Sequence, residues 1–443
     1  MDLAAHPGVD WKALFARRAF RYYFAGMLIS LFGTGMNFAG VTWYVLAETH
    51  STVKVSLIVI LVTLPGLVVP PFGGVLIDRV DRRWLGISLD VGRSATVLVT
   101  AALATAGRLA LWEVYAMVLL LGVGFSIYWS TTNALVQEVI PTDQLVHANA
   151  AVLIAVQGGM LAAGALVGFV YERAGLAGIL AIDGTTYMVS ALCLLRMRRG
   201  YFAPHQSFPQ PTVVSPTIEA PPEMTEPTVL EAVLEPGLAV GLLADIQEGL
   251  RYLRTHPRVF ALGVTFACMM AGVISANVVV VALARDVLHS GARGYGFIEG
   301  GWAVGAVAGG LAAGALARRH APAVLIAALA ILAVGHAVMP YVALLWGAVV
   351  LQIIFGACRA LGGVLTQSSI MATVPRRLMG RTQSAFSVIS TLLQLTMSFT
   401  LGWLAQHTGL PLAFAVLGLL YAGAVVAALR ARALSRPAWP GAA

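Results

Sequence analysis

Long apolar runs, separated by short polar or charged segments, follow one another along most of the chain. A helix needs roughly 20 mostly apolar residues to cross a lipid bilayer, and twelve runs of about that length can be marked. Their approximate ranges are 20–47, 54–77, 85–107, 111–136, 146–170, 175–196, 259–284, 295–317, 321–341, 343–366, 381–406 and 410–430. The pattern predicts an all-α integral membrane protein with twelve transmembrane helices.

The composition supports a membrane protein. Of the 443 residues, 59% are hydrophobic and only 11% are charged, and the mean hydropathy is +0.83. Soluble domains carry about 25% charged residues, so this chain lacks the polar side chains to cover a surface that faces water. The formal net charge of +8 resides mainly at the ends of the apolar runs. It indicates contact with membrane lipids, and no nucleic-acid partner is expected.

The distribution of lysine and arginine predicts the orientation. If the N-terminus is cytoplasmic, 21 of the 28 Lys and Arg residues flank the spans on the cytoplasmic side and five lie on the opposite side. Cytoplasmic loops carry such an excess, so both termini are expected in the cytoplasm. Arg93 and Arg359 lie within predicted spans.

A change in composition divides the twelve spans into six and six. Residues 201–237 hold eight of the 20 prolines and five glutamates, without Lys or Arg, a composition typical of disorder. Next, Ile246, Leu250 and Leu253 form an apolar stripe that predicts a helix lying at the membrane interface. The expected organisation is a six-helix bundle (1–200), a cytoplasmic linker (201–243), an interfacial amphipathic helix (244–258) and a second six-helix bundle (259–443).

The two sets of six spans resemble each other in their landmarks. Arg82 and Arg83 follow the second span as Arg318 and Arg319 follow the eighth, at an offset of 236 residues. Pro141 and Pro375 follow the fourth and tenth spans at an offset of 234. The agreement predicts two pseudo-symmetric bundles, and repeats packed around a midplane site are the architecture of secondary transporters.

A charged motif between the second and third spans identifies a family. The sequence Gly74-x-x-x-Asp78-Arg79-x-x-Arg82-Arg83 resembles the loop motif of the major facilitator superfamily, with Asp81 where the family usually has a second glycine. The segments at 140–150, 181–192, 245–257 and 374–386 are similar to the macrolide-efflux and enterobactin-exporter branch of bacterial drug:proton antiporters.

The resemblance implies the major facilitator fold and a cytoplasmic gate at this motif. In the family, such a motif holds the cytoplasmic side closed when the transporter faces outward. That role is expected of Gly74, Asp78, Arg79, Arg82 and Arg83, although the arginines are also explained by topology alone. Two departures weaken the assignment of efflux: the fifth span reads GALVG at 164–168 without the family's Gly-Pro, and the fourth lacks an arginine common in relatives.

Ionisable residues within spans are costly and mark functional sites by default. Asp90 and Arg93 are three residues apart, so they share a helix face and are expected to pair, either as a structural pair or as part of the gate. Asp90 is also a candidate for proton coupling. Asp183, about two turns from the outer end of its span, has no partner on its own face. Burial favours the neutral form of a carboxyl group, which makes Asp183 a candidate for proton coupling. A purely structural carboxylate is the alternative.

Two further charges lie in the second half. Glu299 lies near the outer end of its span, before a ladder formed by Gly301, Gly305 and Gly309 that permits close helix packing. It is either a proton or cation site in the cavity or a residue of the outer headgroup region. Arg359, expected one to two turns from the cytoplasmic end of its span, either snorkels to the interface or attracts an anionic group of a substrate.

Other polar residues are candidates for the substrate cavity, namely Asn37, Trp43, Tyr44, Gln157 and Gln394. Trp43 and Tyr44 are equally explained as interfacial anchors. Three cysteines, scattered in apolar runs, favour neither disulfides nor a metal site. The sequence holds no Walker motif and no metal-ligand spacing, so no cofactor is expected.

These features predict a multi-pass protein of a bacterial cytoplasmic membrane that is not an enzyme. The expected function is proton-coupled export of small lipophilic drug-like compounds by alternating access, with spans 2, 5, 8 and 11 between the halves and with a monomer as the working unit. An exporter of a specific siderophore or lipid-like metabolite, an uptake symporter and a non-transporting sensor remain alternatives.

Overall fold

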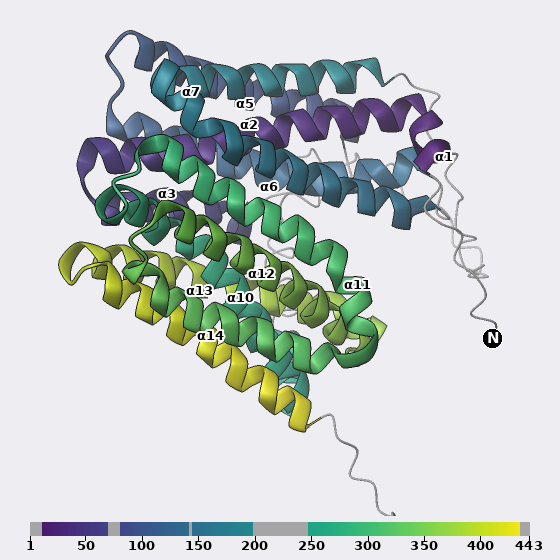
Figure 1. The fold of residues 1–443 in the computed structure, drawn as a ribbon. Coiled ribbons are helices and arrows are strands. Elements are labelled where there is room, and N and C mark those ends of the chain that lie inside the picture. The colour runs from purple at the N-terminus through teal and green to yellow at the C-terminus, as the bar shows by residue number, and fades with distance from the viewer. Residues whose placement is uncertain (1–10, 70–79, 141–143, 198–246, 435–443) are drawn as a thin grey trace, which may run out of the picture.

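The computed structural model describes residues 11–69, 80–140, 144–197 and 247–434 (Figure 1). The first half contains α1 (Trp11–Ala16), α2 (Arg18–Thr49), α3 (Thr52–Thr63), α5 (Arg82–Thr105), α6 (Leu111–Val139) and α7 (Leu145–Arg196). The second contains α10 (Pro257–Ala282), the π-helix η2 (Leu283–Val287), α11 (Gly291–Val338), the 3₁₀ turn η3 (Met339–Tyr341), α12 (Leu345–Thr373), α13 (Arg376–His407) and α14 (Leu410–Ala433). No strand occurs among the described residues.

The described helices account for twelve membrane crossings. Eleven helical segments among the described residues are long and apolar enough to span a bilayer, and one of them, His147–Arg196, includes nearly all of α7. With 52 residues, α7 would measure about 78 Å if straight, which is more than twice the hydrocarbon thickness. Gly175 interrupts it with φ 60° and ψ −162°, so α7 supplies two spans. The prediction of twelve spans is confirmed.

Local capping explains several helix ends. The hydroxyl of Ser51 accepts a hydrogen bond from the Lys54 N–H at the start of α3, and Asp81 accepts from the N–H groups of Arg83 and Trp84 at the start of α5. These bonds satisfy donors that have no partner within the helix. Asp81, which departs from the family motif, therefore acts as the N-cap of α5.

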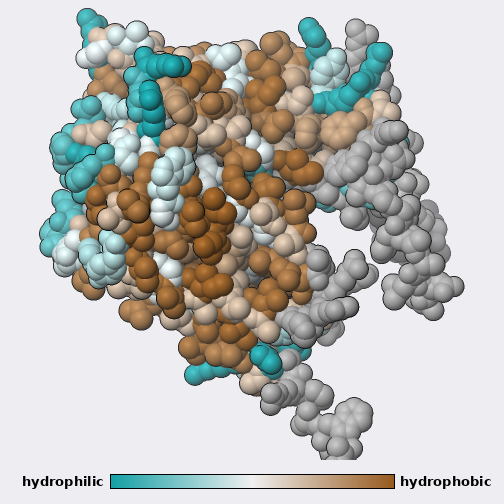
Figure 2. Space-filling view, in the orientation of Figure 1, coloured by the Kyte–Doolittle hydropathy of each residue, from teal (hydrophilic) through white to brown (hydrophobic). Residues whose placement is uncertain are grey.

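The lateral surface is apolar, as a lipid-facing surface must be. Figure 2 shows hydrophobic residues over the middle of the visible face and hydrophilic ones gathered toward its two ends. Trp112, 68% exposed at the start of α6, and Trp346, 65% exposed at the start of α12, lie near one end. Trp84, at the start of α5, is exposed near the other. Tryptophan at such levels is typical of membrane interfaces.

The helices form two bundles. In the first, α2 packs on α7, and α5 on α6 and α7; in the second, α11 packs on α12 and α14, and α10 on α13 and α14. Figure 1 shows the two bundles meeting at one end, here called the closed end, and diverging toward the open end, where α1 and the end of α14 lie. Across the bundles, α3 packs on α10 and α13, and α7 packs on α11. The sequence predicts spans 2, 5, 8 and 11 between the halves, and these lie in α3, α7, α11 and α13. Span 7, which is α10, also packs across the halves and was not predicted there.

The segment that precedes α10 is described only in part. The predicted linker and Ile246 lie outside the described residues, whereas residues 247–255 are helical. Leu250 and Leu253 of the apolar stripe pack in a cluster with Val259 and Phe386, and Glu248 pairs with Arg381 at 2.5 Å. The described part of the stripe thus packs against the protein itself, and an interfacial position of this helix stays a prediction.

The glycine ladder of α11 packs within its own bundle. A Cβ atom at Gly305 would overlap the carbonyl oxygen of Ile353, and one at Gly309 would overlap that of Ala357. Both partners lie on α12. The ladder therefore lets α11 and α12 touch through their backbones, and this face does not lie between the halves.

We expect Gly305→Ala to destabilise the protein, because the added methyl group overlaps the α12 backbone and forces the helices apart. Overpacking of this kind costs about 1–3 kcal/mol, so the midpoint of thermal unfolding of the purified protein should fall. Gly310→Ala is the matched control, since a Cβ there meets nothing within 4 Å. Equal midpoints for the two variants would contradict the packing described.

Candidate functional site

Direct backbone contact between α7 and α11 joins the halves near the closed end. A Cβ atom at Gly164 would lie 2.7 Å from the backbone nitrogen of Gly300, and one at Gly296 would lie 3.0 Å from the carbonyl oxygen of Gly164. A Cβ atom at Gly168 would overlap the backbone of Arg293. Small residues permit such close approach of membrane helices. The GALVG segment at 164–168 thus forms part of the contact between the halves.

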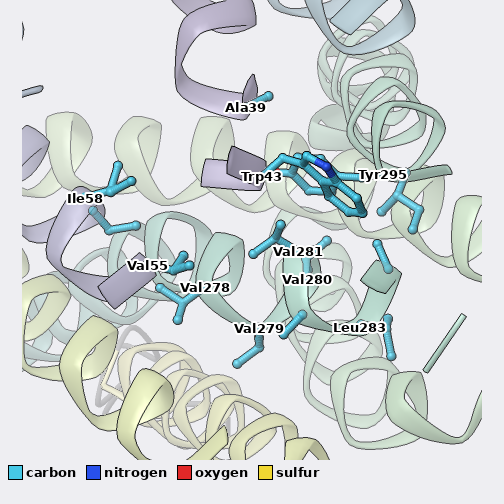
Figure 3. Packing of buried hydrophobic residues seen from close by; sticks show 14 of the residues in the cluster. Ala39, Trp43, Val55, Ile58, Val278, Val279, Val280, Val281, Leu283 and Tyr295 are labelled. Carbon is cyan, nitrogen blue, oxygen red and sulfur yellow. The ribbon is translucent and has the colours of Figure 1, made fainter. Parts of the chain in front are cut away.

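Aromatic and aliphatic side chains close the same end. Trp43 of α2 stacks on Tyr295 of α11, with ring centroids 5.8 Å apart. Figure 3 shows this pair together with Val55 of α3 beside Val278 of α10. All four side chains belong to the largest buried hydrophobic cluster, which therefore extends across both halves.

Polar contacts across the halves surround this apolar contact. Arg293 pairs with Glu172 at 2.5 Å, and Arg285 donates to the carbonyl oxygen of Leu46 at 2.8 Å. Arg285 also contacts His50. At the start of α3, the hydroxyls of Ser51 and Thr52 donate 2.6 Å hydrogen bonds to the side chain of Gln406 and the carbonyl oxygen of Gly402, respectively.

A cavity of about 340 Å³ lies between the halves. Its size falls within the range of small-molecule sites, and its wall is mostly apolar. The polar side chains in its lining are Thr34, Asn37, Tyr187, Asn277, Glu299, His336, Gln352, Arg359 and Tyr421. Among the described residues, no group of three or more His, Cys, Asp or Glu is placed to hold a metal ion.

Asp183 lies behind the cavity wall of the first half. It is fully buried, and its Oδ2 accepts a 2.6 Å hydrogen bond from the amide of Asn37. Its Oδ1 has no hydrogen-bond partner in the described part of the chain. A Cβ atom at Gly33 would lie 2.6 Å from this oxygen, so the absence of a side chain there makes room for the carboxyl group. Asn37 joins Asp183 to the cavity.

Asp90 and Arg93 form the expected ion pair, and both are buried. The guanidinium carbon lies 4.0 Å from the ring centroid of Tyr128 and 4.4 Å from that of Tyr187. Tyr187 in turn shares a 2.9 Å hydrogen bond with Thr34. Cation–π contacts strengthen when they are desolvated. The pair is therefore held inside the first bundle, one aromatic ring away from the cavity.

Glu299 lines the cavity from α11. It lies eight residues after the start of that helix, which is about two turns, and it has no ion-pair partner among the described residues. Of its two predicted settings, the geometry supports the cavity over the headgroup region.

The predicted depth of Arg359 is wrong. The sequence pattern ends its span at residue 366, but α12 continues to Thr373, so Arg359 lies 14 residues from each end of the helix. An arginine side chain is too short to reach an interface from there. Arg359 instead lines the cavity, with its guanidinium carbon 5.7 Å from the ring centroid of Trp302.

Four cavity candidates lie elsewhere, since Trp43, Tyr44, Gln157 and Gln394 do not line this cavity. Trp43 is neither a cavity residue nor an interfacial anchor, because it is buried against Tyr295. Tyr44 packs on the buried hydrophobic cluster. The side chain of Gln394 is half-buried, and its backbone carbonyl accepts a hydrogen bond from Ser275.

Sequence reasoning missed several residues of the second half. His336 lines the cavity and stacks between Phe355 and Tyr421, with centroid distances of 4.2 and 5.0 Å. Asn277 and Gln352 also line it. Each lies inside an apolar run in which polar residues are few, and that rarity is itself a signal for function.

The gate motif is described in part. Gly74, Asp78 and Arg79 lie outside the described residues. Arg82 pairs with Glu138 at the end of α6 at 2.5 Å. Arg83 donates to the carbonyl oxygens of Leu194 and Leu195 at the end of α7. Both arginines thus bind helix ends of their own bundle, near the open end.

Comparison with known proteins identifies a family and two relatives. A family model described as Major Facilitator Superfamily matches residues 23–319. An uncharacterized MFS-type transporter, YfiS of Bacillus subtilis, is 24% identical over 251 residues, which cover 56% of this chain and 52% of the relative. Macrolide efflux protein A of Streptococcus pyogenes is 27% identical over 136 residues, which cover 31% of this chain and 32% of the relative. The matches thus span about half or less of these curated relatives.

Solved transporters share the fold. The POT family transporter PepTSo aligns with a TM-score of 0.67 at 14% identity, covering 94% of this chain and 98% of that chain. A bacterial homologue of the iron transporter ferroportin in an inward-facing state aligns with a TM-score of 0.66 at 16% identity, covering 95% and 99%. The fold class predicted from the sequence is confirmed.

We expect the Asn37–Asp183 hydrogen bond to appear as an energetic coupling. Asn37→Leu leaves a buried carboxyl group without a donor, which costs about 1–3 kcal/mol, whereas Asn37→Leu with Asp183→Leu removes both partners. The double variant should therefore unfold at a higher temperature than the sum of the two single losses predicts. Strict additivity of the three thermal unfolding midpoints would show that the two side chains do not interact.

Proposed function

This chain belongs to the Major Facilitator Superfamily of membrane transporters, and we propose that it is a proton-coupled secondary active transporter. It exports small lipophilic, drug-like compounds across a bacterial cytoplasmic membrane by alternating access, and it works as a monomer in the lipid bilayer. One observation carries the proposal. Between the two bundles, which in the described part of the chain meet at the closed end and diverge from it, lies a mostly apolar cavity lined by Glu299, a carboxyl group without an ion-pair partner among the described residues.

Alternating access requires that the contacts at the closed end form and break as a unit. The stacked Trp43 and Tyr295, the Glu172–Arg293 pair and the α7–α11 backbone contact are all non-covalent contacts between otherwise separate bundles. The excess of Lys and Arg at the open end favours a cytoplasmic position for that end. The structure then corresponds to an inward-facing state in which the cavity receives substrate from the cytoplasm.

The gate motif takes the complementary role at the open end. Arg82 and Arg83 secure the start of α5 to α6 and α7 of their own bundle. In the outward-facing state, Gly74, Asp78 and Arg79 close this end against the second bundle. The divergence of the bundles at the open end (Figure 1) is compatible with a motif that is released in the inward-facing state.

Proton coupling is assigned to Glu299 and Asp183. A carboxylate in a low-dielectric site is costly, and protonation removes that cost. Glu299 lies in the cavity wall without a cationic partner among the described residues, so substrate and proton compete for the same space. Asp183 connects to the cavity through Asn37. Asp90 is already paired with Arg93 and has a structural role within the first bundle.

The substrate class follows from the lining. Apolar side chains from both bundles form most of the wall, which favours molecules that bury hydrocarbon and aromatic surface. A relative named macrolide efflux protein A supports export of such compounds, as do the four segments that resemble its branch.

We expect inside-out vesicles with the intact protein to accumulate a lipophilic dye when a proton gradient is applied. Glu299→Gln should abolish gradient-driven accumulation while dye binding persists, because the variant retains the shape of the side chain but cannot exchange a proton. Asp183→Asn should reduce accumulation in the same way. The measurement is dye fluorescence in vesicles matched for protein level.

Glu113→Gln is the matched control, since Glu113 lies at the start of α6, outside the cavity, and binds the N–H of Ala110. Full gradient-driven accumulation in both Glu299→Gln and Asp183→Asn would remove these residues from coupling. A protein that accumulates dye without any proton gradient would contradict proton-driven transport altogether.

A second test addresses the closed end. Glu172→Arg replaces the attraction to Arg293 by repulsion, so the outward-facing state should become more populated. We expect faster labelling of Ala39→Cys, in the cavity wall, by a membrane-impermeant maleimide added to whole cells of a strain whose protein lacks its three natural cysteines. Combining Glu172→Arg with Arg293→Glu restores opposite charges and should return the rate to its original value. An unchanged labelling rate in Glu172→Arg would exclude the ion pair from the gate.

A further inference from the structure

Arg359 lies at the middle of α12, in the wall of the cavity, and has no anionic partner among the described residues. Among the described residues, its guanidinium group contacts the ring of Trp302 and the sulfur of Met270, which lies 4.0 Å from Nη2. Its Nε is buried and has no hydrogen-bond partner in the described part of the chain. A guanidinium group keeps its proton under physiological conditions and carries five N–H donors. Most of its hydrogen-bonding capacity is thus unused in this structure.

The other buried arginine differs in having a carboxylate partner, although its Nε and Nη1 also lack hydrogen-bond partners in the described part of the chain. Arg93 binds Asp90 and lies between the rings of Tyr128 and Tyr187. Nothing comparable surrounds Arg359. Glu299 shares the cavity with it, but no ion pair joins the two residues in the described structure. A lone cation at mid-membrane depth is costly, so Arg359 needs a counter-ion from outside the protein.

The repeat indicates that packing does not require this charge. The offset of 234 residues between the halves makes Phe125 of α6 the residue of the first bundle that is equivalent to Arg359. Phe125 also lines the cavity. An apolar side chain therefore satisfies the equivalent position of the first bundle, and the guanidinium group is an asymmetric feature of the cavity wall.

We propose that Arg359 binds a negatively charged group, such as a carboxylate, on the transported molecule. The inference rests on the proposed transport function and narrows its substrate class to amphipathic organic acids. The apolar wall binds the lipophilic part of the transported acid, and the ring of Trp302 holds the guanidinium group in place. Gln352, two turns earlier on the same face of α12, also lines the cavity and supplies an amide beside the charged group.

The test compares two probes that differ only in charge. Full-length protein in phosphatidylcholine nanodiscs is equilibrated with 1-pyrenebutyrate or 1-pyrenebutanol, and binding is measured by pyrene fluorescence after equilibrium dialysis against empty nanodiscs. The intact protein should bind the acid at least about tenfold more tightly than the alcohol, the ratio expected for a charge-assisted hydrogen bond. Equal affinities for the two probes would overturn the proposal without any variant.

Substitutions test whether Arg359 causes the preference for the acid over the alcohol. Arg359→Gln should lower the acid-to-alcohol preference to about one while the affinity for the alcohol stays the same, and Arg359→Lys should retain part of it because the charge remains. Arg108→Gln, at an exposed site outside the cavity, removes one positive charge as a control and should keep the full preference. An undiminished preference in folded Arg359→Gln would overturn the assignment.

Two further experiments are needed. One distinguishes a lipid headgroup from a transported acid as the source of the anion, and the other tests proton antiport independently of the anion site. If a lipid headgroup occupies the site, adding phosphatidylglycerol to the nanodiscs should abolish the preference of the intact protein, and that result would overturn binding of a transported acid. Proton-driven dye accumulation is measured separately. Its failure with the acid preference intact would refute the proposed antiport alone, whereas dye transport without the preference would refute the anion subsite alone.

Discussion

The backbone contact between α7 and α11 is the constraint on which the rest of the structure depends. Because Gly164, Gly168, Gly296 and Gly300 have no side chains, the two helices approach closely near the closed end. This approach allows Trp43 to stack on the second bundle and the polar contacts around it to form. The bundles then diverge, and the space between them becomes the cavity. One short contact region thus determines both the closed end and the site.

The two bundles treat their intramembrane charges differently. In the first, Asp90 binds Arg93 and Asp183 binds Asn37, so each charged group has a partner on a helix of the same bundle. In the second, Glu299 and Arg359 line the cavity and form no ion pair among the described residues. Water is scarce at this depth, so polar groups without protein partners require ligands or protons. The first bundle therefore gives each of these charged groups a polar partner within the bundle, and the second places two charged groups without an ion pair on the cavity wall.

The sequence pattern predicts the spans well and the depth of Arg359 poorly. The pattern ends the tenth span at 366 because the polar residues Gln367, Ser368 and Ser369 follow. In the structure the hydroxyl of Ser369 donates to the carbonyl oxygen of Leu365, and that of Thr373 donates to Ser369. Such back-bonding satisfies polar side chains on a continuing helix. The helix therefore extends two further turns, and Arg359 becomes its central residue.

By itself, the sequence determined the twelve spans, the six-and-six division, the family motif and the few charged residues that the membrane interior must accommodate. Those properties are local, because apolar length and composition decide whether a segment enters a bilayer. The tertiary structure alone decided which charges meet. Asn37 and Asp183 are 146 residues apart, and Trp43 reaches Tyr295 in the other bundle. Helix periodicity places a residue on a face of its own helix, but only the packing of the bundles decides whether that face meets a partner, lipid or the cavity.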